Sequence, residues 1–359
     1  MPGQDTAQLG IDVGGTQVKW ALTADGKVVR TGEEPTARQG GNALVDQLGG
    51  LVDRVGGEVD VVGLAMPGLV DTVRRETLFV PNLPGDWDRC PVAERVEERV
   101  AGVRVRLLND ARAFGHGELR LGAGRGAADA LFMTVGTGVG GALARDGDIV
   151  VRAVDRVPEL GHLTVDPHGE RCGCGAVGCL ETVASASALV GRCARAVLTG
   201  QSAALRRLSG GSLARLTARM CAEAADEGDP WALDAFARVG GFIGTAAANA
   251  CVLLQTPVVV IGGGLAGAFH HIAPAAERVL AERAAIIGPV SFRKAELGSH
   301  AGAVGAALFA RTSPNSARIQ RRSDPKDNAG DHTSSIASSH TSSIASSHMS
   351  DNATNHAEN

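Results

Sequence analysis

The residues most able to do chemistry in this sequence are three cysteines and a histidine in one short stretch. Cys172, Cys174 and Cys179 fall within eight residues, and His162 lies ten residues before Cys172. Three thiolates and one imidazole are the number and kind of ligands found in a closed, tetrahedral zinc site. The alternative is a loop with three ordinary thiols, but such dense spacing with a histidine in reach favours zinc. The sequence therefore predicts a structural Zn²⁺ site with these four ligands.

Glycines and carboxylates on the same stretch suggest what the zinc would be for. An ion with four protein ligands has no open position for water, so it would shape the loop rather than catalyse. We expect Gly173, Gly175 and Gly178 to adopt positive φ where the chain folds tightly around the ion. The loop also carries Glu159 and Glu181. Either glutamate alone could be a solvated surface charge, but on a fixed loop the pair predicts a site for a ligand rich in hydroxyl groups.

Two glycine-rich turns each join a pair of apolar segments that we expect to be strands. The run 9–13 leads into the sequence DVGGT at residues 12–16, and the run 128–135 is followed by GTGVGG at residues 136–141. Each could be a plain hairpin turn, but an acid or a hydroxyl beside glycines also leaves backbone N–H groups free to face phosphate oxygens. Their recurrence predicts a duplicated architecture. The candidate phosphate-facing residues are Asp12, Gly14, Gly15, Thr16, Thr137 and Gly138.

Another candidate site lies where the predicted strand 103–108 ends in Asn109 and Asp110, followed by a helix over 111–121. An aspartate at this position can simply cap the helix. It also stands where open α/β sheets carry catalytic carboxylates, at the C-terminal edge of the strands.

Further turns and helices follow from the pattern. A strand over 59–65 runs into Gly68, and Asn82 lies in the loop PNLPG. A strand over 258–261 runs into the triple glycine that includes Gly263 and Gly264, where a flat ligand could approach the backbone, although a strand-to-helix turn is the commoner reason for such glycines. We expect helices over 183–198, 213–226, 230–254, 272–285 and 300–311.

Composition limits the class of protein. With 359 residues, of which 44% are hydrophobic, the chain is long enough for two domains plus an extension. A net charge of −4 argues against a nucleic-acid or membrane-surface partner. The first eight residues have no signal-peptide pattern, and the most apolar region, 243–264, is too interrupted to span a bilayer. The remaining scattered cysteines fit a reducing cytoplasm.

From residue 312 the composition changes to Ser, Asn, Asp and His, and TSSIASSH occurs twice in tandem. This stretch cannot bury enough apolar surface to offset the entropy of ordering, so it is predicted to be a disordered, low-complexity tail over 312–359. His332, His340 and His348 recur at eight-residue spacing; a solvated tail is favoured over a metal site.

Taken in order, these motifs resemble the ROK family of sugar kinases and repressors, within the actin-like/hexokinase superfamily. The resemblance spans about residues 9–311 and rests on LGIDVGGTQVK, LLNDARAFGHGE, MTVGTGVGGAL, ELGHLTVDPHGERCGCGAVGCLE and VVIGGGLA. It implies an α/β, two-domain actin-like ATPase (ribonuclease H-like) fold with a cleft between the domains and a structural zinc loop over 159–181. The small domain would hold 1–112 and 297–311, and the large domain 113–296.

The resemblance also implies an activity, the ATP-dependent phosphorylation of the 6-hydroxyl of a hexose, with glucose as the first choice. Asp110 would be the general base, and Asp12 would position phosphates bound to Mg²⁺. The sugar would contact Gly68, Asn82, Asn109, Asp110, Glu159, His162 and Glu181. Phosphates would lie against Gly14, Gly15, Thr16, Thr137 and Gly138, and adenosine against Gly263 and Gly264. The implied cofactors are ATP, Mg²⁺ and structural Zn²⁺.

Two alternatives stay open. The first is a kinase for an amino or N-acylated hexose of the glucosamine, kanosamine, N-acetylglucosamine or N-acylmannosamine type, since pocket hydrogen bonds decide among hexoses. The second is a sugar-sensing ROK repressor, which the eight residues before the first strand disfavour. Gln17 and Arg112 depart from the family pattern, with Lys and Asn more common there. Partners would be the sugar and ATP, with no nucleic acid and no membrane, in a cytoplasmic homo-oligomer, a dimer or a tetramer.

Overall fold

The computed structural model describes residues 7–55, 57, 59–156 and 158–312. All of them lie in the first of the two units, residues 1–320 and 321–359, into which the chain divides. The predicted tail over 312–359 therefore falls, apart from Thr312, outside the described residues.

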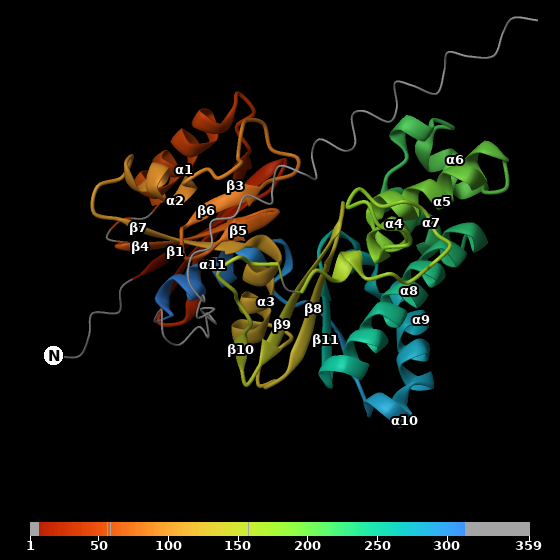
Figure 1. Ribbon diagram of the computed structural model, residues 1–359. Coiled ribbons are helices and arrows are strands. Elements are labelled where there is room, and N and C mark those ends of the chain that lie inside the picture. Colours follow the sequence, from red (N-terminus) through yellow and green to blue (C-terminus); the bar gives the residue numbers. More distant parts are fainter. Residues whose placement is uncertain (1–6, 56, 58, 157, 313–359) are drawn as a thin grey trace, which may run out of the picture. The chain divides into compact units, whose positions relative to one another are not determined.

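The N-terminal half is built on a five-stranded sheet in the order β3-β2-β1-β4-β7 (Figure 1). The first three strands form an antiparallel meander, and β4 and β7 run parallel to β1. The strands are β1 (Gln8–Val13), β2 (Gln17–Ala24), β3 (Lys27–Pro35), β4 (Val61–Met66) and β7 (Arg104–Asn109). A small two-stranded sheet, β5 (Leu69–Asp71) and β6 (Glu76–Phe79), follows β4.

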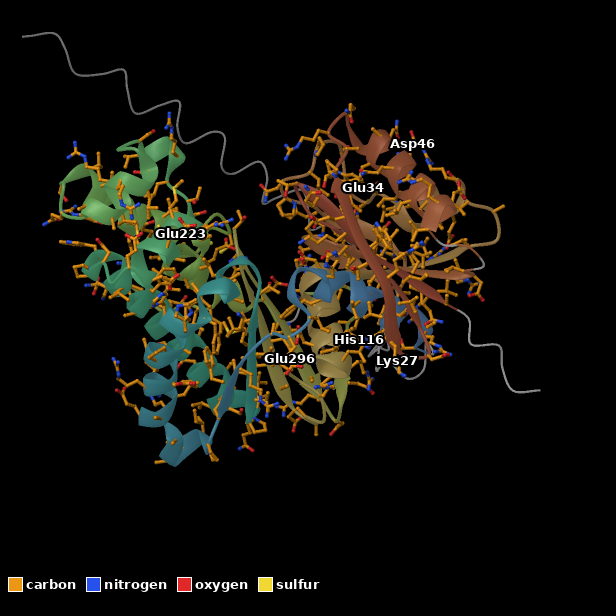
Figure 2. All side chains as sticks on the ribbon, turned by 180° about the vertical axis from the view of Figure 1, so that it is seen from behind. Lys27, Glu34, Asp46, His116, Glu223 and Glu296 are labelled. Atoms are coloured by element: carbon orange, nitrogen blue, oxygen red, sulfur yellow. The ribbon has the colours of Figure 1, made fainter. Side chains whose placement is uncertain are left out.

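Two helices cover the apolar side of this sheet. They are α1 (Gly41–Val55) and α2 (Val92–Glu97). Leu44, Leu48 and Leu51 recur at helical spacing on α1, and all are buried in one aliphatic core with β1 and β4. Arg54 of α1 forms an ion pair with Glu34 of β3 at 2.8 Å. Glu34 is labelled in Figure 2.

The second half repeats this strand arrangement in the order β10-β9-β8-β11-β12. Three strands again form an antiparallel meander, and two run parallel to its inner strand. The strands are β8 (Ala130–Val135), β9 (Val139–Arg145), β10 (Asp148–Ile149), β11 (Val258–Gly262) and β12 (Ser291–Lys294). The predicted duplication, with one strand–glycine–strand hairpin in each copy, is confirmed.

Two helices connect the halves. They are α3 (Asp110–Leu121), which packs on β8 and β9, and α11 (Ala301–Arg311), which packs on β1 and β4. Their backbones cross closely, since a Cβ placed on Gly305 would lie 1.7 Å from the Ala113 carbonyl oxygen. The predicted domain bounds, 1–112 with 297–311 and then 113–296, stay a proposal, which the packing of α11 on the first sheet supports.

The helical part of the second half differs from the predicted pattern at three places. One is the expected helix 272–285, which begins earlier, at Phe269, and ends at Glu282. Ser185 caps a new helix by accepting a hydrogen bond from the Ala188 N–H, so the expected helix 183–198 is two helices. The expected helix 213–226 begins only at Ala218, because Thr217 caps it there. The elements are η1 (Leu160–His162), α4 (Leu180–Ala184), α5 (Ala186–Leu198), α6 (Ala203–Ser209), η2 (Leu213–Arg215), α7 (Ala218–Asp226), α8 (Pro230–Leu254), η3 (Gly264–Ala268), α9 (Phe269–Glu282), α10 (Ala284–Ile287) and η4 (Gly298–His300).

The predicted helix over 230–254 is confirmed as α8. Asp229 caps it by accepting hydrogen bonds from two backbone N–H groups, and Pro230 occupies its first turn. Within the described residues α8 is the one helix with the length and apolar character to cross a membrane, yet 50% of its apolar window is buried. It packs along α9 and contributes Phe236, Val239 and Ile243 to the core, which is the behaviour of a core helix.

Candidate functional site

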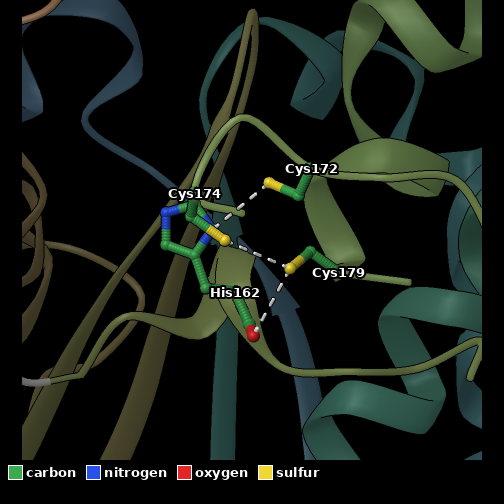
Figure 3. A group of neighbouring side chains, drawn as sticks. All are labelled: His162, Cys172, Cys174 and Cys179. Atoms are coloured by element: carbon green, nitrogen blue, oxygen red, sulfur yellow. Dashed lines mark hydrogen bonds between the residues drawn. The ribbon is translucent and has the colours of Figure 1, made fainter. Parts of the chain in front are cut away.

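The four predicted zinc ligands converge in the structure (Figure 3). The Cys172 Sγ lies 3.6 Å from the His162 Nδ1, and the Sγ atoms of Cys174 and Cys179 are 3.7 Å apart. A tetrahedral Zn²⁺ with Zn–S of about 2.3 Å and Zn–N of about 2.0–2.1 Å separates neighbouring ligand atoms by about 3.6–3.8 Å. The donor set and its spacing therefore fit a zinc ion, held by the Nδ1 of His162, so that its Nε2 remains for another partner.

Local backbone geometry explains how the chain brings these ligands together. Gly178 has φ +73°, and a Cβ there would lie 1.6 Å from the Asp166 carbonyl oxygen, so only glycine fits. Gly175 has φ +93°. The expectation of positive φ is wrong for Gly173, which is absent from the described positive-φ glycines and has open space around it. The turn after Cys172 needs only one left-handed residue, and Gly175 supplies it.

The junction of β7 and α3 arranges two polar side chains. Asn109 is the N-cap of α3, and its Oδ1 accepts hydrogen bonds from the N–H groups of Ala111 and Arg112. Asp110 is the first residue of the helix, so the residue that caps the helix is Asn109 and not Asp110. The Asp110 Oδ1 accepts from the Ala111 N–H at 2.8 Å and from the Asn109 Nδ2 at 2.9 Å. Its other oxygen, Oδ2, has no partner among the described hydrogen bonds.

Asp110 lies close enough to Asp12, at the same edge of the sheet, for the two negative charges to interact. β1, β4 and β7 are parallel, so their C-terminal ends meet at one edge. Burial raises the pKa of Asp12 to about 7, together with the negative charge of Asp110 and against the effect of Lys19. Burial also raises the pKa of Asp110, and hydrogen bonds from Ala111 and Asn109 oppose it. Two desolvated carboxylates in electrostatic contact are hard oxygen donors that suit Mg²⁺.

The carboxylate of Asp12 lies over the first turn of α11. A Cβ on Gly302 would be 2.4 Å from the Asp12 Oδ2, so this position of the helix must lack a side chain. The N-terminal turn of a helix favours a negative group. No motif in the sequence marks Gly302; the available signal is a glycine in the first turn of an alanine-rich helix.

The first glycine turn is closed by a hydrogen bond from the Gly14 N–H to the Gln17 carbonyl at 2.9 Å. Thr36 donates from its hydroxyl to the Gly14 carbonyl at 2.7 Å, while Thr16 at the turn is exposed. Asn82 lies beside this turn, since a Cβ on Gly15 would be 3.4 Å from the Asn82 carbonyl oxygen. The structure therefore brings Asn82 next to the predicted phosphate residues, although its predicted partner is the sugar.

The second and third glycine turns lie next to each other, because β8 and β11 are neighbouring parallel strands. A Cβ on Gly136 would be 3.8 Å from the Gly264 N. Glu181 also lies here: its Oε2 accepts from the Val139 N–H at 3.0 Å and lies 2.4 Å from a Cβ placed on Gly138. Among the described hydrogen bonds and ion pairs, Glu181 is joined to the second glycine turn and not to Asp110 or Glu159.

Arg112 links the helix start to the zinc loop. Its side chain is 1% exposed, and its guanidinium donates to the Asn109 Oδ1 at 3.1 Å, the Gly141 carbonyl at 3.0 Å and the Glu159 Oε1 at 2.7 Å. Its Nε also lies 3.4 Å from the Oδ2 of Asp155, which is fully buried. In the sequence Arg112 stands out only as a departure from the family pattern, and no motif marks Asp155.

This network defines the neighbourhood of Asp110. The Asn109 Nδ2 donates to the Gly68 carbonyl at 2.9 Å as well as to Asp110, so both of its amide hydrogens are used. Gly68 has φ +83°, and a Cβ there would lie 2.2 Å from the Phe79 carbonyl oxygen. Asn109 thus links Gly68 and Asp110, and Arg112 links Asn109 to Glu159.

Comparison with known proteins places this geometry in a family. The sequence profile of the ROK family matches residues 8–313. A glucokinase of Halalkalibacterium halodurans is 33% identical over 87% of this chain and 97% of its own length. A glucokinase of Streptomyces coelicolor is 32% identical over 84% of this chain and 97% of its own length. An N-acetylmannosamine kinase of Escherichia coli is also 32% identical, over 84% and 98%.

Solved structures agree with this match. A ROK family glucokinase from Streptomyces griseus, in complex with glucose and AMPPNP, superposes with a TM-score of 0.74 at 33% identity, covering 86% of this chain and all of that one. A homologue of the Escherichia coli Mlc protein, a ROK family transcriptional regulator, has a TM-score of 0.76 at 22% identity, covering 85% and 78% of the two chains, and shows the shared fold. The predicted α/β, actin-like ATPase fold is confirmed.

Proposed function

We propose that this chain, which belongs to the ROK family, is a sugar kinase that transfers the terminal phosphoryl group of ATP to the 6-hydroxyl of a hexose, with glucose as the preferred substrate. The observation that carries the proposal is Asp110: a carboxylate with a raised pKa at the end of β7, beside Asp12 and within one hydrogen-bonded network with the zinc loop. The similarity of the chain to glucokinases over nearly their whole length supports the reaction type.

We assign the removal of the hydroxyl proton to Asp110. Its Oδ1 is held by two hydrogen bonds, so Oδ2 is the atom that accepts the proton of the attacking hydroxyl. A general base is most effective when its pKa lies near the working pH, and burial raises the pKa of Asp110 in that direction. Phosphoryl transfer otherwise depends on positioning and charge neutralisation.

We assign phosphate binding to the glycine turns. Backbone N–H groups of the turns at 14–16 and 137–138 would face phosphate oxygens, and the neighbouring turn at 263–264 would face adenosine. Asp12 would hold Mg²⁺, chiefly through its water shell. When bound, the ion neutralises phosphate charge, and its positive charge would lower the pKa of Asp12 from about 7.

Sugar binding is assigned to residues near Asp110. Glu159 is 37% exposed, so one of its oxygens can accept from sugar hydroxyls while the other is held by Arg112. The Nε2 of His162 can contact the sugar while Nδ1 faces the zinc. Asn109 would reach the sugar by exchanging its bond to the Gly68 carbonyl. Structural Zn²⁺ would hold this side of the pocket in place. Glu181 would also stabilise the second glycine turn through the hydrogen bond that it accepts from the Val139 N–H.

A kinase for N-acetylmannosamine is the second candidate, because a relative with that name is as similar in identity as the glucokinases. We further place the enzyme in the cytoplasm as a homo-oligomer, a dimer or a tetramer.

A coupled ADP-release assay with a panel of hexoses tests the proposal. Glucose should give the highest kcat/KM, and phosphorus NMR should find the product phosphate on the 6-position. Asp110→Asn should lower kcat by about 10²–10⁴-fold, the usual contribution of a general base, while glucose binding measured by calorimetry stays within a few-fold. Turnover of N-acetylmannosamine alone would favour the second candidate, and full activity of Asp110→Asn would refute the base assignment.

A further inference from the structure

Three side chains far from Asp110 in sequence converge on the surface of the helical part of the second half. The Nε2 atoms of His270 and His271 lie 2.9 Å and 2.7 Å from one and the same atom, the Oδ1 of Asp226. The three potential ligand atoms all lie within 4.8 Å of one another.

Two helices and a packed ring hold this arrangement. Asp226 is the last residue of α7, and the two histidines are the second and third residues of α9. The side chain of His271 is only 13% exposed, and its ring lies 5.5 Å from that of Phe236 in α8. The two imidazoles lie 4.0 Å apart. His271 is therefore positioned by the core, and the other two side chains meet it there.

Neighbouring carboxylates are already paired with arginines. Glu223, which lies one turn before Asp226 on α7, accepts a hydrogen bond from Arg219 at 3.0 Å. Glu223 is labelled in Figure 2. Glu227, the next residue after Asp226, pairs with Arg207 at 2.5 Å. Asp226 has no arginine partner among the described ion pairs, and its carboxylate faces two imidazoles instead.

Two imidazole nitrogens and one carboxylate oxygen form a ligand set that suits first-row divalent ions. In a tetrahedral zinc site, ligands at about 2.0–2.2 Å from the ion are separated by about 3.3 Å. The observed 2.7 Å and 2.9 Å would need to open by about half an ångström, which exposed Asp226 and His270 side chains allow (56% and 62% exposed). Water would complete the coordination on the exposed side.

We propose that Asp226, His270 and His271 bind a divalent first-row transition ion, preferentially Zn²⁺, and that the ion joins the end of α7 to the start of α9. This site shares no ligand with the zinc loop, and it does not depend on the proposed kinase reaction.

The test counts zinc in the 359-residue chain. A starting variant, His332→Ala/His340→Ala/His348→Ala/His356→Ala, removes the four histidines of the tail as a source of loose binding. Elemental analysis after Zn²⁺ loading and gel filtration should then find two equivalents per chain, one for each site. Adding Asp226→Asn should leave one. Asparagine keeps the acceptor oxygen for both imidazoles, so the fold should survive, and far-UV circular dichroism checks this.

Calorimetric Zn²⁺ titration gives the second readout. Asp226→Asn should weaken the second event by more than about tenfold, since losing even an outer partner of a ligand costs about 10–100-fold. Asp234→Asn, another exposed aspartate that pairs with Arg238, is the matched control and should bind like the starting variant. Co²⁺ separates the two sites: only the zinc loop should give thiolate charge-transfer absorption. One equivalent in the starting variant, or two in Asp226→Asn, overturns the proposal.

Discussion

Replacing Arg112 with methionine tests the network that joins Asn109, next to the proposed general base Asp110, to Glu159 in the predicted zinc loop. Methionine fills much of the same volume but removes the charge from a side chain that is 1% exposed. Asp155, which is fully buried, would lose its ion-pair partner, and Glu159 and Asn109 would each lose a hydrogen-bond donor. Removing one partner of a buried ion pair typically costs about 3–5 kcal/mol. We expect a loss of that size in the free energy of unfolding at pH 7.5.

The pH dependence of this loss has a definite sign. Burial raises the pKa of Asp155 to about 6, against the lowering effect of Arg112. Because the folded pKa lies above the usual 3.8, the fold prefers protonated Asp155 and loses stability as the pH rises from about 3.8 to 6. Without Arg112 the pKa rises further, and the loss extends above pH 6 at up to about 1.4 kcal/mol per pH unit. The variant should therefore be closer to the parent at pH 5.5 than at pH 7.5.

A double-mutant cycle measures the coupling free energy between Arg112 and Asp155. Urea unfolding gives the stability of the parent, Arg112→Met, Asp155→Asn and the double variant. Asp155→Asn removes the charge that Arg112 neutralises, so the double variant should lose less than the sum of the single losses. Additive losses within about 0.5 kcal/mol, the agreement expected of independent sites, would refute the coupling. In activity, Arg112→Met should raise the KM for glucose through loosened Glu159 while leaving the KM for ATP within about twofold, the spread of unrelated sites.

Three further predictions concern the rest of the site. The kcat/KM should fall as the pH drops through the raised pKa of Asp110, with the acid limb above pH 3.8; a profile that stays flat down to pH 4 would contradict the base assignment. Cys174→Ser should remove bound zinc, measured by elemental analysis, and raise the KM for glucose; unchanged zinc content would speak against the predicted ligand set. Gly302→Ala should weaken ATP binding in calorimetry, because its methyl group would lie 2.4 Å from the Asp12 Oδ2; parental ATP affinity would show that Asp12 is not constrained there.

Much of this fold could be predicted from the chain because its signals are local. The four predicted zinc ligands lie within an 18-residue segment, from His162 to Cys179, so turns of fixed geometry suffice to bring them together. The hairpin after Asp12 and the one after Val135 are each set by a short glycine turn between apolar strands. Helix α8 follows from its N-cap Asp229, Pro230 and a long apolar pattern.

Only the tertiary structure decided which distant side chains meet. Arg112 reaches Glu159 across 47 positions of the chain, and His270 reaches Asp226 across 44, because helices and strands pack side by side. The same packing places Asn82 and Glu181 at glycine turns. Residue type and spacing specify turns, caps and ligand sets, whereas the partner of a buried charge depends on how whole elements pack. Short-range chemistry is therefore readable in the sequence, and long-range pairing is not.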